Sequence, residues 1–128
     1  MAARDWAGPW QHVPAGKPAL ARDWAAALLP FAPDGTARPE LQLYLRRDLE
    51  TVHDALLAEP PDAAAAVKLG AALVRRGLTD PAAVAVTVTL LGDRLLTELG
   101  LDEATFHRPL QVLLGGIAAG YAGALAGK

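Results

Sequence analysis

The segment Glu50-Thr51-Val52-His53 places a carboxylate and an imidazole at the spacing that di-iron helical bundles use to direct both groups at one metal. Such a bundle needs a second pair of the same spacing and two further glutamates that project inward. The nearest candidate, Glu103 with His107, has a different spacing. Because the ligand set is incomplete, we expect no metal site, and we expect His53 at a solvent-facing or edge position.

Covalent catalysis has few candidate residues in this chain. The sequence contains neither serine nor cysteine, two of the common nucleophiles of covalent catalysis. It also lacks a glycine-rich loop followed by Lys and then Ser or Thr, the arrangement that cradles a phosphate. We therefore expect a protein that is not an enzyme and that carries no cofactor.

The charge distribution argues against nucleic acid as a partner. The formal net charge is -2 and the sequence pI is about 5.8, so the positive field that phosphate binding exploits is missing. Two arginine pairs, Arg46-Arg47 and Arg75-Arg76, are the only concentrated positive charge. We predict that both pairs are solvated side chains at the ends of helices.

Composition predicts one small all-α domain. The chain has 128 residues, of which 52% are hydrophobic, and this is enough apolar material for a single core. Glycine and proline interrupt the first residues, which predicts a flexible arm over residues 1–17. Residues 18–128 are expected to form one compact bundle of about five helices.

Apolar side chains recur at helical spacing along this predicted domain. The first helix starts near Pro18 and ends at Pro30, and the second and longest follows a proline-rich loop. Their predicted inner faces are Leu20, Trp24, Leu28 and Phe31 for the first, and Leu41, Leu45, Leu49, Val52 and Leu56 for the second.

Helix boundaries in the middle of the chain carry capping residues. Pro60-Pro61-Asp62 is expected to end one helix and start the next, Asp80 before Pro81 is a predicted N-cap, and Gly77 suits the left-handed position after a helix. The inner face of the helix between Asp62 and Asp80 is expected to be Val67, Gly70, Ala71, Val74 and Leu78. Residues 84–90 alternate like a strand but continue a helical stripe, so we predict a helix that buries Val84, Val88, Leu91 and Leu95.

The last helix is expected to begin at an Asp102 N-cap and to kink or restart at Pro109. Residues 110–127 carry no charge, and 18 residues is the minimum length of a membrane span. More than half of these residues are Gly or Ala, so we expect a buried or dimer-forming helix and no span. Gly116, Gly120 and Ala124 recur every four residues, which predicts close helix packing within the domain or between two chains.

The middle of the chain resembles a known family. The matching segments include residues 56–60, residues 67–74, residues 78–84 and Leu90-Leu91-Gly92-Asp93-Arg94-Leu95-Leu96. They are similar to the N-terminal helical region of actinobacterial cyclic di-GMP signalling proteins, where it precedes diguanylate cyclase (GGDEF) and phosphodiesterase (EAL) domains. The likeness extends from residues 20–25 to residues 115–121. Neither catalytic signature occurs in this chain.

The first six residues lack the apolar core of a signal peptide, so we expect a cytoplasmic protein. The resemblance implies a non-catalytic sensory, regulatory or dimerisation module. Such a module would act on an attached or partner cyclase or phosphodiesterase domain and would form a homodimer. The alternative is a stand-alone helical sensor that binds a small apolar ligand or a haem. His53 and His107 are then the candidate axial ligands.

Overall fold

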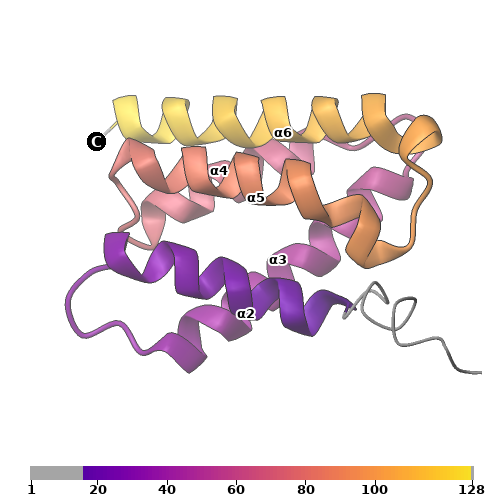
Figure 1. Ribbon diagram of the computed structural model, residues 1–128. Helices are drawn as coiled ribbons and strands as arrows, with labels where there is room; N and C mark the ends of the chain where they lie inside the picture. Colours follow the sequence, from indigo (N-terminus) through magenta and orange to yellow (C-terminus); the bar gives the residue numbers. More distant parts are fainter. Residues whose placement is uncertain (1–15, 128) are drawn as a thin grey trace, which may run out of the picture.

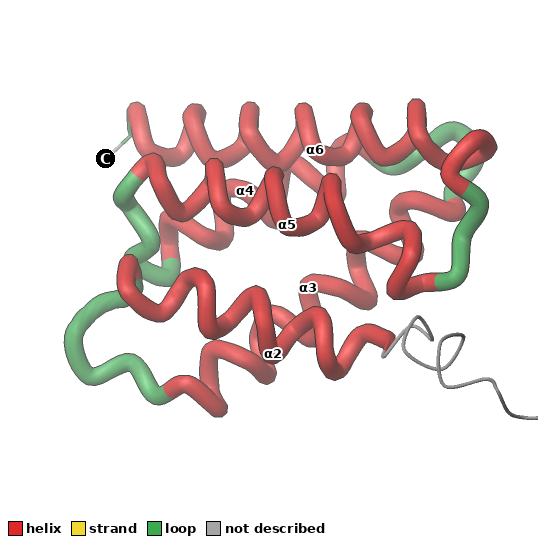
Figure 2. Tube along the Cα trace, in the orientation of Figure 1, coloured by secondary structure: helices red, strands yellow, loops and turns green. Residues whose placement is uncertain are grey.

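The computed structural model describes residues 16–127, which form five α-helices and one short 3₁₀ helix. They are α2 (Gly16–Leu28), the 3₁₀ helix η1 (Leu29–Phe31), α3 (Arg38–Leu57), α4 (Ala63–Arg75), α5 (Pro81–Leu99) and α6 (Glu103–Ala126). The part of the chain that the structure describes contains no strand (Figure 2), so the predicted all-α fold is confirmed. Residues 84–90 lie within α5 and are helical.

Most of the predicted N-terminal arm, residues 1–15, lies outside the described residues. Gly16 and Lys17 fall within α2, so this helix begins two residues earlier than expected. Two contacts hold its start. The Gly16 amide donates to Glu98 Oε1 of α5 at 3.1 Å, and Lys17 Nζ lies 2.8 Å from Glu50 Oε1 of α3.

The helices pack in two groups. Figure 1 shows α4, α5 and α6 together along one side, with α2 and α3 crossing below them. The most extensive contact joins α4 to α6, while α2 touches both α3 and α5. One apolar core connects all five helices, and its largest fully buried side chains include Trp24, Leu45, Leu73, Leu91 and Leu113.

The predicted N-caps Asp80 and Asp102 are confirmed, and Asp62 caps α4 in the same way. The side chains of Asp62, Asp80 and Asp102 accept hydrogen bonds from backbone amides in the first turns of α4, α5 and α6, at 3.1, 2.9 and 2.8 Å. Each bond satisfies an amide that has no partner within the helix. Hydrogen bonding by Thr105 also lowers the pKa of Asp102, which keeps this cap ionised.

The buried faces of α4 and α5 differ from the predicted ones. In α4 the buried residues are Ala66, Leu69, Gly70, Leu73 and Val74, whereas Val67 is 40% exposed. The reason is that α6 lies against the backbone of Val67 and leaves its side chain to solvent. In α5, Ala83 and Thr87 are buried where we expected Val84 and Val88.

A buried hydrogen bond explains the shift in α5. Trp24 is fully buried, and its indole Nε1 donates to Thr87 Oγ1 at 3.0 Å. A buried donor without a partner costs free energy, so the hydroxyl of Thr87 takes the inner position. Val84 and Val88 are half-buried beside the core.

Candidate functional site

The glutamate–histidine pair of α3 has other neighbours than a cluster of metal ligands among the described residues. Lys17 pairs with Glu50, and this hydrogen bond lowers the pKa of the Glu50 carboxyl. His53 is half-buried at the edge of α3. Within residues 16–127 no group of three or more His, Asp or Glu side chains is placed to hold a metal ion.

The second histidine candidate lies on a different helix. His107 is exposed in the second turn of α6, with its Nδ1 3.1 Å from Glu103 Oε2. Neither His53 nor His107 lines the pocket described below. No contact of either residue favours the haem alternative.

The small-residue stripe of α6 packs against α4 within the chain. A Cβ atom at Gly120 would overlap the carbonyl group of Val67, and one at Gly116 would lie 2.9 Å from the Cβ of Ala66. In the opposite direction, a Cβ at Gly70 of α4 would overlap the Ile117 carbonyl of α6. Ala124 is half-buried next to the core. These glycines allow two helix backbones to touch, and α6 continues through Pro109 without restarting.

Arg76 is not the solvated helix-end charge that the sequence predicted. It follows the last residue of α4, and its Nη1 and Nη2 donate to the two carboxylate oxygens of Asp48 in α3, at 2.6 and 3.3 Å. Its guanidinium carbon lies 5.0 Å from the centre of the Tyr44 ring. Arg76 thus ties the end of α4 to α3 by a bidentate ion pair and a cation–π contact. Arg46, Arg47 and Arg75 are exposed, as expected.

Local sequence could not reveal this role, because Asp48 and Arg76 lie far apart in the chain. The one available signal is that Tyr44 and Asp48 are four residues apart, which places them on one face of α3. The partner that this face meets depends on how α3 crosses α4, and neither helix specifies that angle by itself.

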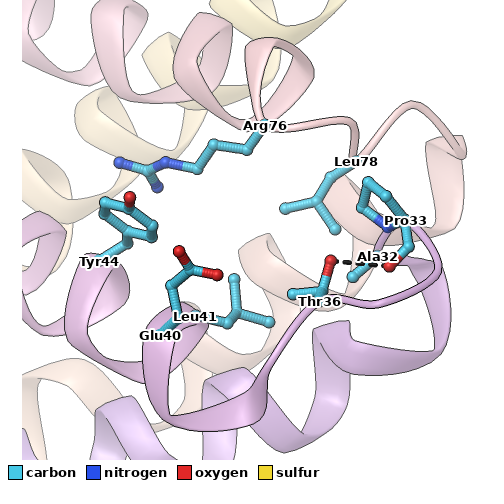
Figure 3. A pocket seen from close by; sticks show the side chains of 8 residues that line it. All are labelled: Ala32, Pro33, Thr36, Glu40, Leu41, Tyr44, Arg76 and Leu78. Carbon is cyan, nitrogen blue, oxygen red and sulfur yellow. Dashed lines mark hydrogen bonds between the residues drawn. The ribbon is translucent and has the colours of Figure 1, made fainter.

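A pocket of about 340 Å³ opens beside Arg76. We call it the Arg76 pocket, and it is lined by Ala32, Pro33, Thr36, Glu40, Leu41, Tyr44, Arg76 and Leu78. These residues come from the loop after η1, the first turns of α3, the end of α4 and the loop that follows. Figure 3 shows the Glu40 carboxylate and the Arg76 guanidinium on the same side of the pocket as Tyr44. Thr36 lies on the opposite side, and Leu41 and Leu78 lie in the middle.

The end of α4 holds Arg76 and Leu78 in fixed positions. The Gly77 amide donates to the Val74 carbonyl at 2.9 Å, and the Leu78 amide donates to the Leu73 carbonyl at 3.0 Å. This is the Schellman pattern that ends helices on a left-handed residue, and Gly77 has φ +90°. A Cβ at Gly77 would also lie 2.5 Å from Pro33 Cγ, so the loop after η1 packs directly on this turn.

The same turn is held from the other side by α6. The Tyr121 hydroxyl donates to backbone carbonyls of the α4–α5 loop, and its oxygen lies 2.6 Å from Leu78 O and 2.8 Å from Asp80 O. Burial raises the pKa of Tyr121, helped by the nearby charge of Asp80. The hydroxyl therefore stays protonated and remains a donor at neutral pH. Residues 76–80 connect the Arg76 pocket with the C-terminal half of α6.

Comparisons with known proteins identify no relative of this chain. The chain matches no protein-family model, and searches of curated proteins and of solved structures find no match either. The described residues define a small all-α domain with a mixed polar and apolar pocket beside Arg76.

Proposed function

We infer that this chain is a non-catalytic sensory and regulatory module, in which occupancy of the Arg76 pocket changes the packing of α6. The observation that carries the inference is the dual role of Leu78. Its side chain lines the pocket, while its carbonyl accepts the hydrogen bond of Tyr121 from α6. A ligand in contact with the Leu78 side chain therefore touches the turn whose backbone is hydrogen-bonded to Tyr121 of α6.

Regulation requires two arrangements of this turn with different ligand affinity. The pocket has walls on both helix groups, since Tyr44 belongs to α3 and Arg76 to the end of α4. A molecule between them changes the separation of α3 and the α4–α5 loop. Tyr121 passes that displacement to α6 because its hydrogen bonds hold two carbonyls of the loop.

The output surface in this proposal is the outer side of α6. From residue 111 onward, its exposed residues carry no charge, and they are Gln111, Val112, Gly115, Ala118, Ala119, Ala122, Gly123 and Ala126. Small uncharged side chains allow another helix to approach closely. We assign this face to a second copy of the chain, in a homodimer that would place two output domains together.

The partner in this proposal rests on the sequence resemblance. It supports a place in cyclic di-GMP signalling, with an attached or partner cyclase or phosphodiesterase domain, and we propose that the chain acts in the cytoplasm. Among residues 16–127, α6 is the single helix long and apolar enough to span a membrane, and core helices of soluble proteins meet the same criterion. Its backbone contacts with α4 at Gly70, Gly116 and Gly120 support a packed helix.

A thermal-shift panel tests the sensory role. The probes are L-amino acids, monocarboxylates, primary amines and mononucleotides, each titrated against the whole chain and against Ala32→Trp, which fills the pocket. A ligand of the native state raises the midpoint of unfolding with concentration. The proposal expects one class to do so in the wild type and not in Ala32→Trp. If all four classes leave Tm unchanged, or the filled variant responds equally, the sensory role is wrong.

A further inference from the structure

Two opposite charges face the Arg76 pocket without pairing with each other. Glu40 stands in the first turn of α3, and its carboxylate has no ion pair with any side chain in residues 16–127. Arg76 directs two of the five N–H donors of a guanidinium at Asp48. Its other donors remain available to a ligand. Figure 3 shows both charged ends beside one opening.

The rest of the wall is apolar or already bonded. Leu41 and Leu78 are 4% and 1% exposed, and Ala32 and Pro33 complete an apolar side. The Thr36 hydroxyl donates to the Pro33 carbonyl at 2.7 Å. The pocket therefore offers an acceptor for a cation, a donor set for an anion, and an apolar surface beside both.

The charges also select the ligand. The ion pair with Asp48 reduces the positive field of Arg76 but leaves N–H donors free, so a simple anion gains donors and meets the Glu40 carboxylate, whereas a simple cation gains Glu40 and leaves those donors without an acceptor. A molecule with both charges avoids either conflict. The volume of about 340 Å³ lies near the lower end of small-molecule sites, roughly 300–1,000 Å³, which suits a metabolite the size of an amino acid.

We propose that the Arg76 pocket binds a free α-amino acid with an apolar side chain, whose ammonium group contacts Glu40 and whose carboxylate contacts Arg76. The side chain then lies on Leu41 and Leu78. This proposal rests on the sensory function above and names its ligand class.

The test is a ¹⁵N NMR titration of the whole chain with L-leucine and three analogues. 4-Methylpentanoate lacks the ammonium group, isoamylamine lacks the carboxylate, and glycine lacks the apolar side chain. The expected result is saturable shifts of the Thr36, Tyr44 and Leu78 amides with L-leucine. Each analogue should bind at least about tenfold more weakly, because 4-methylpentanoate and isoamylamine each lose one charged contact and glycine loses the apolar contact with Leu41 and Leu78.

Two matched variants identify the ammonium contact. Glu40→Gln removes the carboxylate from an exposed position, and Glu59→Gln removes one from the exposed loop between α3 and α4. L-Leucine should bind Glu40→Gln at least about tenfold more weakly and Glu59→Gln with wild-type affinity. The advantage of L-leucine over 4-methylpentanoate should vanish in Glu40→Gln.

The contrary outcomes separate the two proposals. The zwitterion assignment is overturned if L-leucine gives no saturable shift at about 10 mM, or if Glu40→Gln binds it as tightly as the wild type. If monocarboxylates or amines alone stabilise the chain in the thermal-shift panel, the sensory function stands and this ligand class is wrong. If nothing in the panel binds, both fail.

Discussion

Thr87 shows how one side chain decides which face of a helix is buried. It is the single fully buried polar residue in the described core, and its hydroxyl is the partner of the Trp24 indole. The alternation of valine and threonine along residues 84–90 gave no reason to place Thr87 inward. The reason lies on α2, which is distant in sequence, so a reading of α5 alone favoured the two valines.

The first prediction concerns this bond. Thr87→Val keeps the side-chain shape but leaves the buried Trp24 N–H without an acceptor, so it should lower the free energy of unfolding by ~1–3 kcal/mol. Thr89→Val removes a hydroxyl from an exposed position of the same helix and is the control. Urea denaturation of both variants measures the difference. Equal stability of the two would contradict the assigned role of Thr87.

A second prediction at this scale concerns pH. Arg94 Nη1 lies 2.7 Å from Asp23 Oδ2, and this hydrogen bond holds the pKa of Asp23 below its ordinary value of 3.8. A carboxyl with a lowered pKa in the folded state stabilises the protein above its unfolded pKa and loses that effect as the pH falls. The wild type should therefore exceed Asp23→Asn in stability at pH 7, by less than ~1 kcal/mol because the pair is partly exposed.

The same difference should shrink as the pH falls from about 4 through the lowered pKa of folded Asp23. Thermal unfolding at a series of pH values follows it. A gap that stays constant from pH 7 to pH 2 would show that the ion pair with Arg94 does not stabilise the fold.

At the scale of elements, the helix caps and the buried faces of α2 and α3 could be predicted from the sequence, whereas the faces of α4 and α5 could not. Asp62, Asp80 and Asp102 act within one turn of themselves, so local sequence suffices to identify them as caps. The side of α4 that is buried depends on where α6 lies. Because α6 approaches through glycine, it contacts backbone at Val67, and no apolar side chain marks that contact in the sequence.

The third prediction tests this glycine contact. Gly120→Ala places a methyl group against the Val67 carbonyl, and neither backbone can yield easily, so it should lower stability by ~1–3 kcal/mol. Gly123→Ala lies on the same helix with nothing within 4 Å of the new methyl group, and it should raise stability by up to ~1 kcal/mol. Chemical denaturation compares them. Destabilisation of both would indicate that helix propensity, and not contact with α4, governs α6.

For the whole molecule, the described residues bury one side of α6 and, from residue 111 onward, leave the other side without charge. The predicted homodimer uses that outer side.

Ala119→Glu introduces a charge at the centre of this outer side, and Ala64→Glu introduces the same charge on the exposed side of α4. Sedimentation should give a dimer for the wild type and Ala64→Glu, and a monomer for Ala119→Glu, since an unpaired buried charge opposes association. A wild type that stays monomeric at high concentration would contradict the dimer.

The all-α class could be predicted at this scale because apolar spacing repeats along the whole chain. The Arg76 pocket could not, since its walls come from four separate segments and meet only when α3 crosses the end of α4. Arginine at a helix end is ordinarily solvated, and nothing near Arg76 in sequence distinguishes it from Arg75. Only the packed structure joins Arg76 to Asp48 and Tyr44.

The central claim is that residues 76–80 couple the pocket to α6, and ¹⁵N NMR of a pocket-filling variant tests it without any ligand. Thr36→Trp fills the pocket, and Asp34→Trp adds the same ring to the exposed part of that loop. The coupling predicts that the amides of Gly120, Tyr121 and Ala122 shift in Thr36→Trp but not in Asp34→Trp. It further predicts that the response disappears when Thr36→Trp is made in a Tyr121→Phe background. Unchanged α6 amides in Thr36→Trp, or a response that survives the loss of the Tyr121 hydroxyl, would contradict the account.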